Sequence, residues 1–125
     1  MWIHDYYKCR PVDFVIMDGL QGIQNGPTPC YEVSRTLRLS KDQMNMRLIL
    51  AGRDAVAVDT VEALIMNWDP QSVKYLVFLN KSGLGNICPS AISVRGKKVD
   101  EVRKDFAGVR PPAGGYPIKK MTTPA

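Results

Sequence analysis

The sequence predicts an α/β fold, a small partly parallel sheet with helices packed mainly on one face. Two short runs rich in aliphatic and β-branched residues, at 12–17 and 46–51, predict buried strands. A stretch with apolar residues at helical spacing follows the second run, and a third apolar run lies at 91–94. Strand, loop, strand, helices and strand is the order of an α/β domain, in which a right-handed crossover joins parallel strands.

The composition is that of an ordinary globular domain. The chain has 125 residues, of which 45% are hydrophobic and 23% charged, and these fractions exclude disordered, collagen-like and coiled-coil proteins. No apolar run approaches the roughly 20 residues that span a bilayer, and the first ten residues lack the hydrophobic segment of a signal peptide. We therefore expect a cytoplasmic protein with no membrane contact, built as one α/β domain over residues 1–106.

The first strand is expected to end at the turn signal Asp18-Gly19, and the glycine- and proline-rich stretch 18–29 after it reads as a loop. Glycine lets a ligand approach the main chain, and open α/β sheets bind ligands at the carboxyl ends of their strands. A plain tight connection is the alternative. The candidate ligand-binding residues of this loop are Asp18, Gly19, Gly22, Asn25, Gly26 and Pro27. Beyond it, 31–45 is expected to be irregular, with a short strand around 36–39.

The strongest helix of the chain is expected directly after the second strand, which ends at Gly52. Asp54 is suited to cap its start, and Asn67 with Asp69-Pro70 is suited to end it. Its apolar residues recur at helical spacing, at Val58, Val61, Leu64, Ile65 and Trp68.

The start of this helix is a second candidate for ligand binding, through Arg53, Asp54 and Asp59. The unpaired N–H groups and partial positive charge of a helix N-terminus favour an anion. Asp59 is expected either to face the sheet edge with a partner such as Arg53, or to lie on the exposed stripe of the helix. If Asp18, Asp54 and Asp59 met at one edge, their oxygens would suit a hard divalent cation. We assign no metal ligand and no catalytic residue.

A second helix is expected to start at Asp69-Pro70 and to end at Ser82-Gly83. A short polar helix is expected within 97–106, followed by a basic tail rich in proline and glycine at 107–125. The first 94 residues hold nine Lys and Arg against nine Asp and Glu, whereas the last 31 hold eight against three. Because the tail has one aromatic residue and no reading motif, the sequence argues against nucleic acid and favours a solvated tail or one packed on a partner.

The three cysteines, Cys9, Cys30 and Cys88, are expected to be free thiols, because their number is odd and no secretion signal accompanies them. No CxxC pair occurs, so we expect neither a zinc ribbon nor an iron–sulfur cluster from this chain alone. His4 is the only histidine and no nucleophile elbow is present, which argues against Ser/His or Cys/His hydrolytic catalysis.

Two motifs, DFVIMDGLQGIQNGPTP and LILAGRDAVAVDTVEALIMNWDP, followed by KSGLGN, resemble the C-terminal part of the domain-of-unknown-function 362 family. The similarity covers about residues 13–106. Members of that family are generally more than twice this length and are often described as iron–sulfur-associated proteins of unknown activity. Some carry ferredoxin-type four-iron–four-sulfur motifs, but the family's N-terminal half and its cluster cysteines have no counterpart here.

The resemblance assigns family positions to residues of both motifs. The stretch between Pro29 and Met46 is longer than the family's usual connection, which leaves open how the chain leaves the glycine-rich loop. The matched positions are Asp18, Gly19, Asn25, Gly26 and Pro27 in the first motif, and Ala57, Val58, Asp59, Asp69 and Pro70 in the second.

Together these features predict that the chain binds a small anionic ligand or a metal at the glycine-rich strand-end loop of a redox-associated protein. The alternative is a non-catalytic interaction or oligomerisation module. Strands buried on both faces read as uninterrupted apolar runs, as these do, whereas helices are expected mainly on one side. We therefore expect a homo-oligomer, or a partner subunit or domain that covers the other face.

Overall fold

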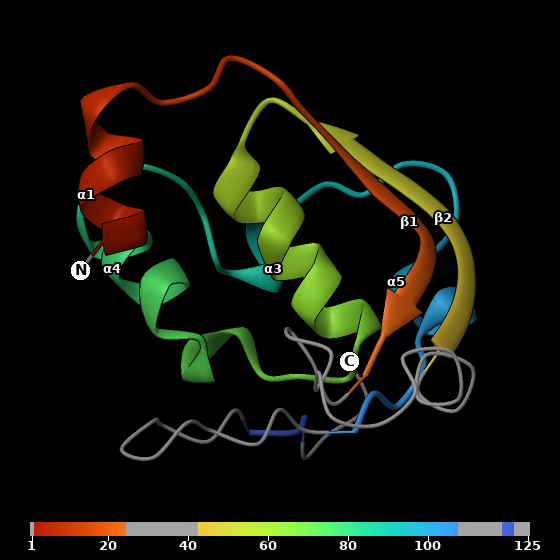
Figure 1. The fold of residues 1–125 in the computed structure, drawn as a ribbon. Coiled ribbons are helices and arrows are strands. Elements are labelled where there is room, and N and C mark those ends of the chain that lie inside the picture. The colour runs from red at the N-terminus through yellow and green to blue at the C-terminus, as the bar shows by residue number, and fades with distance from the viewer. Residues whose placement is uncertain (1, 25–42, 108–118, 122–125) are drawn as a thin grey trace, which may run out of the picture.

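The structure, a computed structural model, describes residues 2–24, 43–107 and 119–121. Helix α3 lies between the sheet on one side and helices α1 and α4 on the other (Figure 1). The elements in chain order are α1 (Trp2–Cys9), β1 (Val15–Ile23), β2 (Gln43–Gly52), α3 (Ala55–Ile65), the 3-10 helix η1 (Pro70–Ser72), α4 (Lys74–Lys81), the 3-10 helix η2 (Pro89–Ala91) and α5 (Val99–Val102). The mixed α/β class is confirmed.

The sheet has two antiparallel strands, with Val15 opposite Gly52 and Ile23 opposite Gln43. The prediction of a partly parallel sheet is wrong, because the third strand expected at 91–94 does not form. Pro89, which has no N–H to give to a ladder, opens η2 at that point instead. In the described part of the chain there is no third strand, so no crossover connection there places two strands in parallel.

Strand β1 does not end at Asp18-Gly19 but continues into the glycine-rich stretch as far as Ile23. A register shift between Gly19 and Gln21 marks a bulge, near which Arg47 of β2 has a φ of 55°. A Cβ at Gly22 would lie 2.7 Å from Cζ of the buried Phe106. The missing side chain of Gly22 therefore makes room for the Phe106 ring.

Helix α3 begins where its sequence pattern predicts, but it ends at Ile65, so Trp68, which was expected on the helix, lies beyond it in a bridge to Lys120. Oδ1 of Asp54 accepts a hydrogen bond from the backbone N–H of Ala57 at 3.0 Å, so Asp54 is the N-cap. The helix ends before Met66, and Asn67 takes a left-handed φ of 61°. Seven of its residues are buried: Val56, Val58, Thr60, Val61, Ala63, Leu64 and Ile65.

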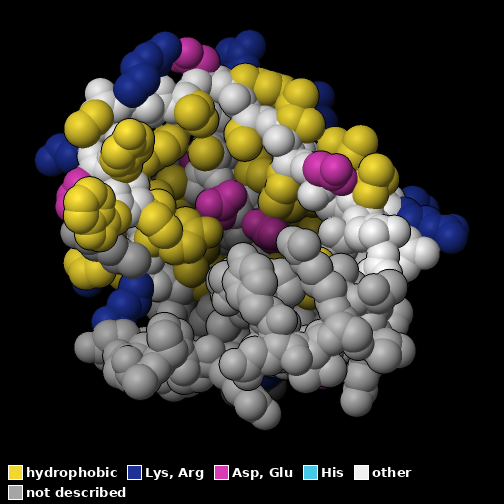
Figure 2. Space-filling model, in the orientation of Figure 1, with side chains coloured by type: hydrophobic (Ala, Val, Ile, Leu, Met, Phe, Trp, Pro, Cys, Tyr) yellow, Lys and Arg dark blue, Asp and Glu magenta, His cyan; other side chains and the backbone are white. Residues whose placement is uncertain are grey.

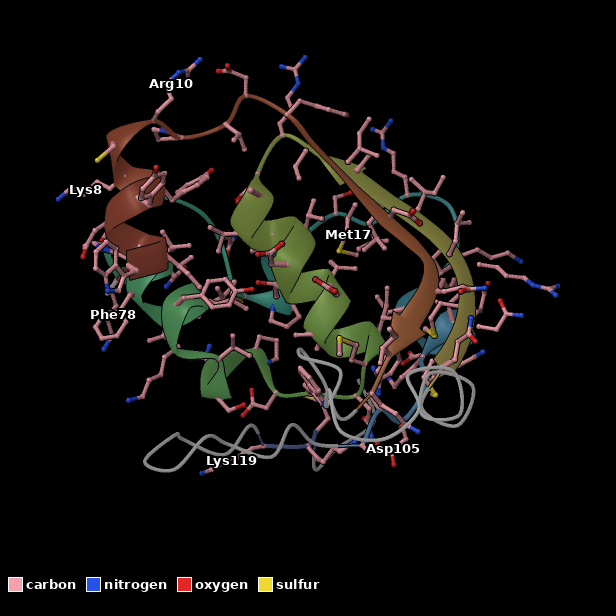
Figure 3. All side chains as sticks on the ribbon, viewed as in Figure 1. Lys8, Arg10, Met17, Phe78, Asp105 and Lys119 are labelled. Atoms are coloured by element: carbon pink, nitrogen blue, oxygen red, sulfur yellow. The ribbon has the colours of Figure 1, made fainter. Side chains whose placement is uncertain are left out.

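The tightest core lies between α3 and α4, where Leu76 is fully buried against Val56, Leu79 and Ile87. On the other side of α3, Met17 of β1 extends between the strand and the helix (Figure 3). The helices of the described residues thus cover the inner face of the sheet only.

The outer face of the sheet is open. Exposure alternates along both strands, and Ile16 and Ile49, which point away from α3, are 69% and 67% exposed. Leu20 and Ile23 are half exposed as well. An apolar surface of this kind is what a second protein surface covers in larger sheets.

The later elements agree in part with their predictions. Asp69 and Pro70 do start a helical segment, but it is η1, and α4 begins only after Val73. Gly83, with a φ of 70°, follows the C-cap of α4, and α5 falls within the short helix expected at 97–106. The helix α1 was not expected, and the strand suggested at 36–39 lies outside the described residues.

The described residues near the C-terminus contact the turn after α3. The backbone N–H of Asp69 donates to the Lys119 carbonyl at 2.7 Å, and that of Met121 donates to the Asn67 carbonyl at 3.2 Å. This part of the basic tail therefore contacts the domain. Of the helices in the described ranges, none has the length and apolar character to cross a membrane.

Candidate functional site

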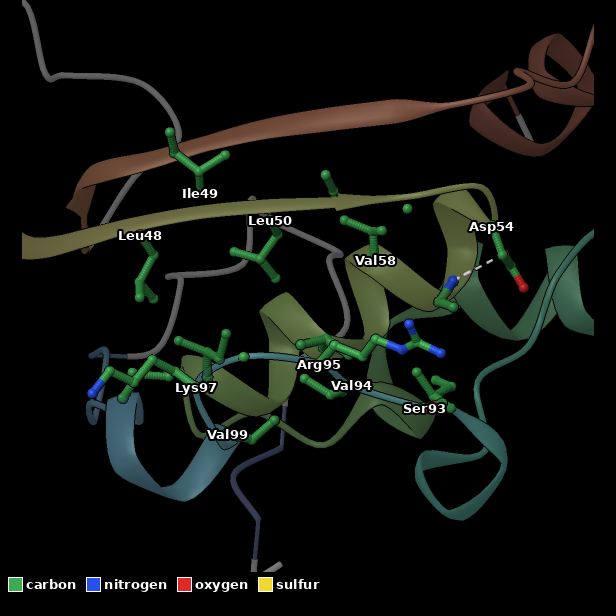
Figure 4. Close-up of a pocket in the computed structure, with 18 of the residues that line it drawn as sticks. Leu48, Ile49, Leu50, Asp54, Val58, Ser93, Val94, Arg95, Lys97 and Val99 are labelled. Atoms are coloured by element: carbon green, nitrogen blue, oxygen red, sulfur yellow. Dashed lines mark hydrogen bonds between the residues drawn. The ribbon is translucent and has the colours of Figure 1, made fainter.

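A groove of about 740 Å³ lies between β2, α3 and the segment 91–97, and we call it the basic groove (Figure 4). One wall is formed by residues 47–52 of β2 and the other by 91–97. Leu48 and Leu50 point into it, whereas Ile49 points away. The floor is apolar and comes from Val58, Val61 and Ile65 of α3. Its size is that of a small-molecule or peptide site.

The lining of the basic groove is strongly positive. Among the described residues, four cationic residues line it, against a single acidic residue, Asp54. Within the described ranges, the three arginines make no ion pair, and Lys97 lies 4.0 Å from Glu101 in an exposed pair. Uncompensated positive charge around a cavity attracts anions. The four cations are Arg47, Arg53, Arg95 and Lys97.

Asp54 links the start of α3 to the chain at Asn86. Its Oδ1 accepts the N–H of Ala57, and its Oδ2 accepts the backbone N–H of Asn86 at 3.0 Å. A Cβ at Gly85 would lie 2.5 Å from Oδ1 of Asp54, so only glycine lets the chain pass so close. Both oxygens of Asp54 are therefore used within the fold, and they fix the segment before Cys88 against the start of α3.

The predicted strand-end loop does not form where it is described. Asp18 and Gly19 lie within β1, and Asp18 is opposite Ile49 in the ladder. Oδ1 of Asp18 accepts the backbone N–H of Leu20 at 2.9 Å, on exposed surface. Gly22 packs against Phe106, as described above. The other loop candidates, Asn25, Gly26 and Pro27, lie outside the described residues.

Of the second group of predicted residues, Arg53 and Asp54 line the basic groove but Asp59 does not. Asp59 is half-buried, and it accepts a hydrogen bond from the Tyr75 hydroxyl of α4 at 3.0 Å. The hydrogen-bond partner of Asp59 is thus Tyr75, and not Arg53 as expected. Burial raises the pKa of the Asp59 carboxyl, and the hydrogen bond from Tyr75 opposes that rise.

Glu62 lies one turn further along α3. Burial, with the negative charge of Asp59, raises the pKa of its carboxyl. Burial and the charge of Asp59 also raise the pKa of Tyr75. Acidic side chains lie among hydrophobic ones on the face shown in Figure 2. In the described ranges, no three His, Cys, Asp or Glu side chains gather as they would around a metal ion, so Asp18, Asp54 and Asp59 do not converge.

The sequence alone does not predict the roles of several residues in the basic groove and around Asp59. The sequence shows the excess of basic residues after residue 94. It does not show that Arg95 and Lys97 lie across a groove from β2. No local signal distinguishes Arg47 or Tyr75. Of the cysteines, Cys9 and Cys88 are free and exposed, and Cys30 lies outside the described residues.

No protein-family model, curated protein or solved structure matches the chain. The resemblance to the domain-of-unknown-function 362 family therefore stays a prediction.

Proposed function

We propose that the chain is a binding module for an anionic ligand, which it takes up in the basic groove. The observation that carries this proposal is that four cationic residues line one cavity. Asp54, the one acidic residue that lines the groove among the described residues, already accepts two backbone N–H groups. An incoming anion would thus gain several donors without competing with a free acidic group.

The groove has the parts that recognition of an anion needs. An arginine guanidinium presents parallel N–H donors that match a carboxylate or a phosphate, and Arg95 extends along the groove towards its Asp54 end (Figure 4). The N-terminal end of α3, where Arg53 lies, adds the positive end of the helix dipole. The apolar floor would cover the uncharged part of a ligand. A role in a redox-associated protein is implied by the motif resemblance alone, and the test below does not depend on it.

The test is calorimetric titration of the protein with pyrophosphate and with citrate at low ionic strength. We expect binding that weakens as salt is added. In an Arg53→Gln/Arg95→Gln double variant the affinity should fall at least about tenfold, because each hydrogen bond to a charged group contributes about 1.5–3 kcal/mol.

The matched control is Arg10→Gln. Arg10 is an exposed arginine, 3.1 Å from Asp13 and outside the groove, so its replacement should leave the affinity unchanged. Equal affinity of the double variant and the parent would contradict the proposal, as would the absence of binding to either anion.

The open outer face of the sheet favours a second candidate function, an oligomerisation module. A second copy of the chain, related by a twofold axis, would cover the same patch on both molecules. Light scattering over a concentration series should then show a dimer that Ile49→Thr weakens, since Ile49 is 67% exposed at the centre of this face. A protein that stays monomeric at every concentration would rule this function out.

A further inference from the structure

The free edge of β2 runs along the basic groove. In the described part of the chain, β2 pairs only with β1, so its other edge has no neighbouring strand. All six residues 47–52 line the groove. Successive side chains of a strand point to opposite faces, and the side chain of Ile49 points away from the groove whereas those of Leu48 and Leu50 point into it. Ile49 therefore lines the groove through its backbone, so the groove reaches the main chain of β2 as well as its inner face.

The opposite wall also presents unpaired backbone. Residues 91–97 line the groove without interruption. Ile92 is extended, with φ −100° and ψ 116°, and the backbone of 93–97 makes no hydrogen bond with the described residues. The groove thus lies between two stretches of backbone whose N–H and C=O groups are open to a partner.

From these two walls we infer that the anionic ligand of the basic groove is an acidic, extended polypeptide segment, which adds a strand to the free edge of β2. This inference rests on the function proposed above and names the class of ligand. Strand addition supplies main-chain hydrogen bonds, and the side chains of the added strand supply specificity.

The lining favours a segment that alternates aliphatic and acidic residues. In an extended segment, every second side chain would lie on the apolar floor formed by Val58, Val61 and Ile65. The side chains between them would face cations such as Arg53 and Arg95. The regular part of the edge, 48–52, offers room for about five residues at about 3.4 Å each.

A small anion would use the cations but not the backbone edge. It would leave the backbone N–H and C=O groups of both walls to water, whereas an added strand pairs them. The cations beside the edge also disfavour pairing with a neutral or basic strand, as charged side chains do at the edges of natural sheets. Charge and backbone together therefore select an acidic strand.

The experiment uses a capped, fluorescently labelled peptide of about seven residues that alternates valine and glutamate. Anisotropy should show binding at low salt, and hydrogen exchange should show protection of amides in 48–52 and 93–97. Arg95→Gln should weaken binding about tenfold, whereas Arg10→Gln should not. The same peptide N-methylated at alternate residues keeps its charge but loses one edge of donors, so it should bind at least about tenfold more weakly.

The outcomes separate this inference from the proposed function. If pyrophosphate binds and the N-methylated peptide binds as tightly as its parent, strand addition is wrong while anion binding stands. Peptide binding without amide protection in 48–52 leads to the same conclusion. If those amides are already protected in a concentration-dependent dimer, the occupant is a second copy of the chain. If neither pyrophosphate nor the peptide binds, both proposals fail.

Discussion

The two sides of α3 differ in how their charged groups are paired. Towards the basic groove, Arg53 and Arg95 are exposed and form no ion pair with the described residues. Away from the groove, Asp59 is half-buried and accepts a hydrogen bond from Tyr75, with Glu62 one turn further on. One side therefore has unpaired charge beside a cavity, and the other has a paired polar group among apolar side chains.

This difference separates stability from binding. A half-buried polar group without a partner destabilises a fold, so the pairing of Asp59 with Tyr75 is explained by folding alone. Exposed cations that have no partner contribute little to folding. Substitutions on the Tyr75 side should change the free energy of unfolding, and those of the groove cations should change affinity.

The largest effect is expected at Asp54, because this side chain contributes both to the stability of the fold and to the shape of the groove. Asp54→Ala removes the N-cap of α3, a loss of about 0.5–2 kcal/mol. It also leaves the Asn86 N–H without its acceptor, for about 1–3 kcal/mol more. Urea denaturation should show a loss of about 2–4 kcal/mol, and pyrophosphate binding should weaken as the groove wall loosens.

Asp54→Asn is the control for that variant. Asparagine keeps one acceptor oxygen and can still cap the helix, so the loss should be about half as large. If Asp54→Ala unfolds at the same urea concentration as the parent, the junction between α3 and the segment before Cys88 does not depend on this side chain.

The next effect tests the other side of α3. Tyr75→Phe removes the hydroxyl that donates to Asp59 and leaves a half-buried carboxylate without that donor. The free energy of unfolding should fall by about 1–2 kcal/mol, while anion affinity stays the same. Tyr6→Phe is the matched control, because Tyr6 is 80% exposed and should be neutral. A change in anion affinity in Tyr75→Phe would mean that the two sides of α3 are coupled.

The features that the sequence predicted correctly are those set by neighbouring residues. The spacing of apolar residues located α3, and Asp54 and Asn67 marked its ends, because a helix start, its cap and its stop lie within a few residues of one another. The same reasoning failed for Gly22. A glycine at this position predicts a turn from local sequence, but in the fold Gly22 makes room for the ring of Phe106, a residue far away in the chain.

The groove escaped prediction for the same reason. Its walls, 47–52 and 91–97, lie more than 35 residues apart, and neither has a local pattern that requires the other. Arg53 and Asp54 were predicted because a helix N-terminus is a local feature, whereas Arg95 acquires its position only through packing. The partly parallel sheet failed because it depended on a third strand at 91–94, where η2 ends and the following residues pair with no strand of the described part of the chain.

A smaller effect concerns pH. Burial and the charge of Asp59 raise the pKa of Glu62 above its ordinary value of 4.5, so the folded protein holds this proton to a higher pH than the unfolded chain does. The stability from this group is complete below the unfolded pKa and is lost as pH rises through the folded pKa. Glu62→Gln should therefore flatten the fall in unfolding free energy above about pH 4.5, measured by urea denaturation across pH.

The pKa of Asp105 is shifted in the opposite direction from that of Glu62, so its effect on the pH dependence of stability has the opposite sign. The hydrogen bonds from Lys120 and Asn67 lower the pKa of its carboxyl, so its contribution is present above the unfolded pKa and is lost as pH falls. Asp105→Asn should therefore reduce the loss of stability in acid. If Glu62→Gln and Asp105→Asn change the pH profile in the same direction, the desolvation of Glu62 is not the cause of its effect.

The smallest effect on stability is expected for the groove cations. Arg53→Gln and Arg95→Gln should each change the free energy of unfolding by less than about 0.5 kcal/mol, because neither cation has an ion pair to lose in the described part of the fold. Removing one of several like charges should even stabilise the protein slightly at low salt, and added salt should abolish that gain. Urea denaturation at two ionic strengths measures both effects. A loss above about 1 kcal/mol would place these arginines among the groups that hold the fold together, and the two sides of α3 would then no longer differ in kind.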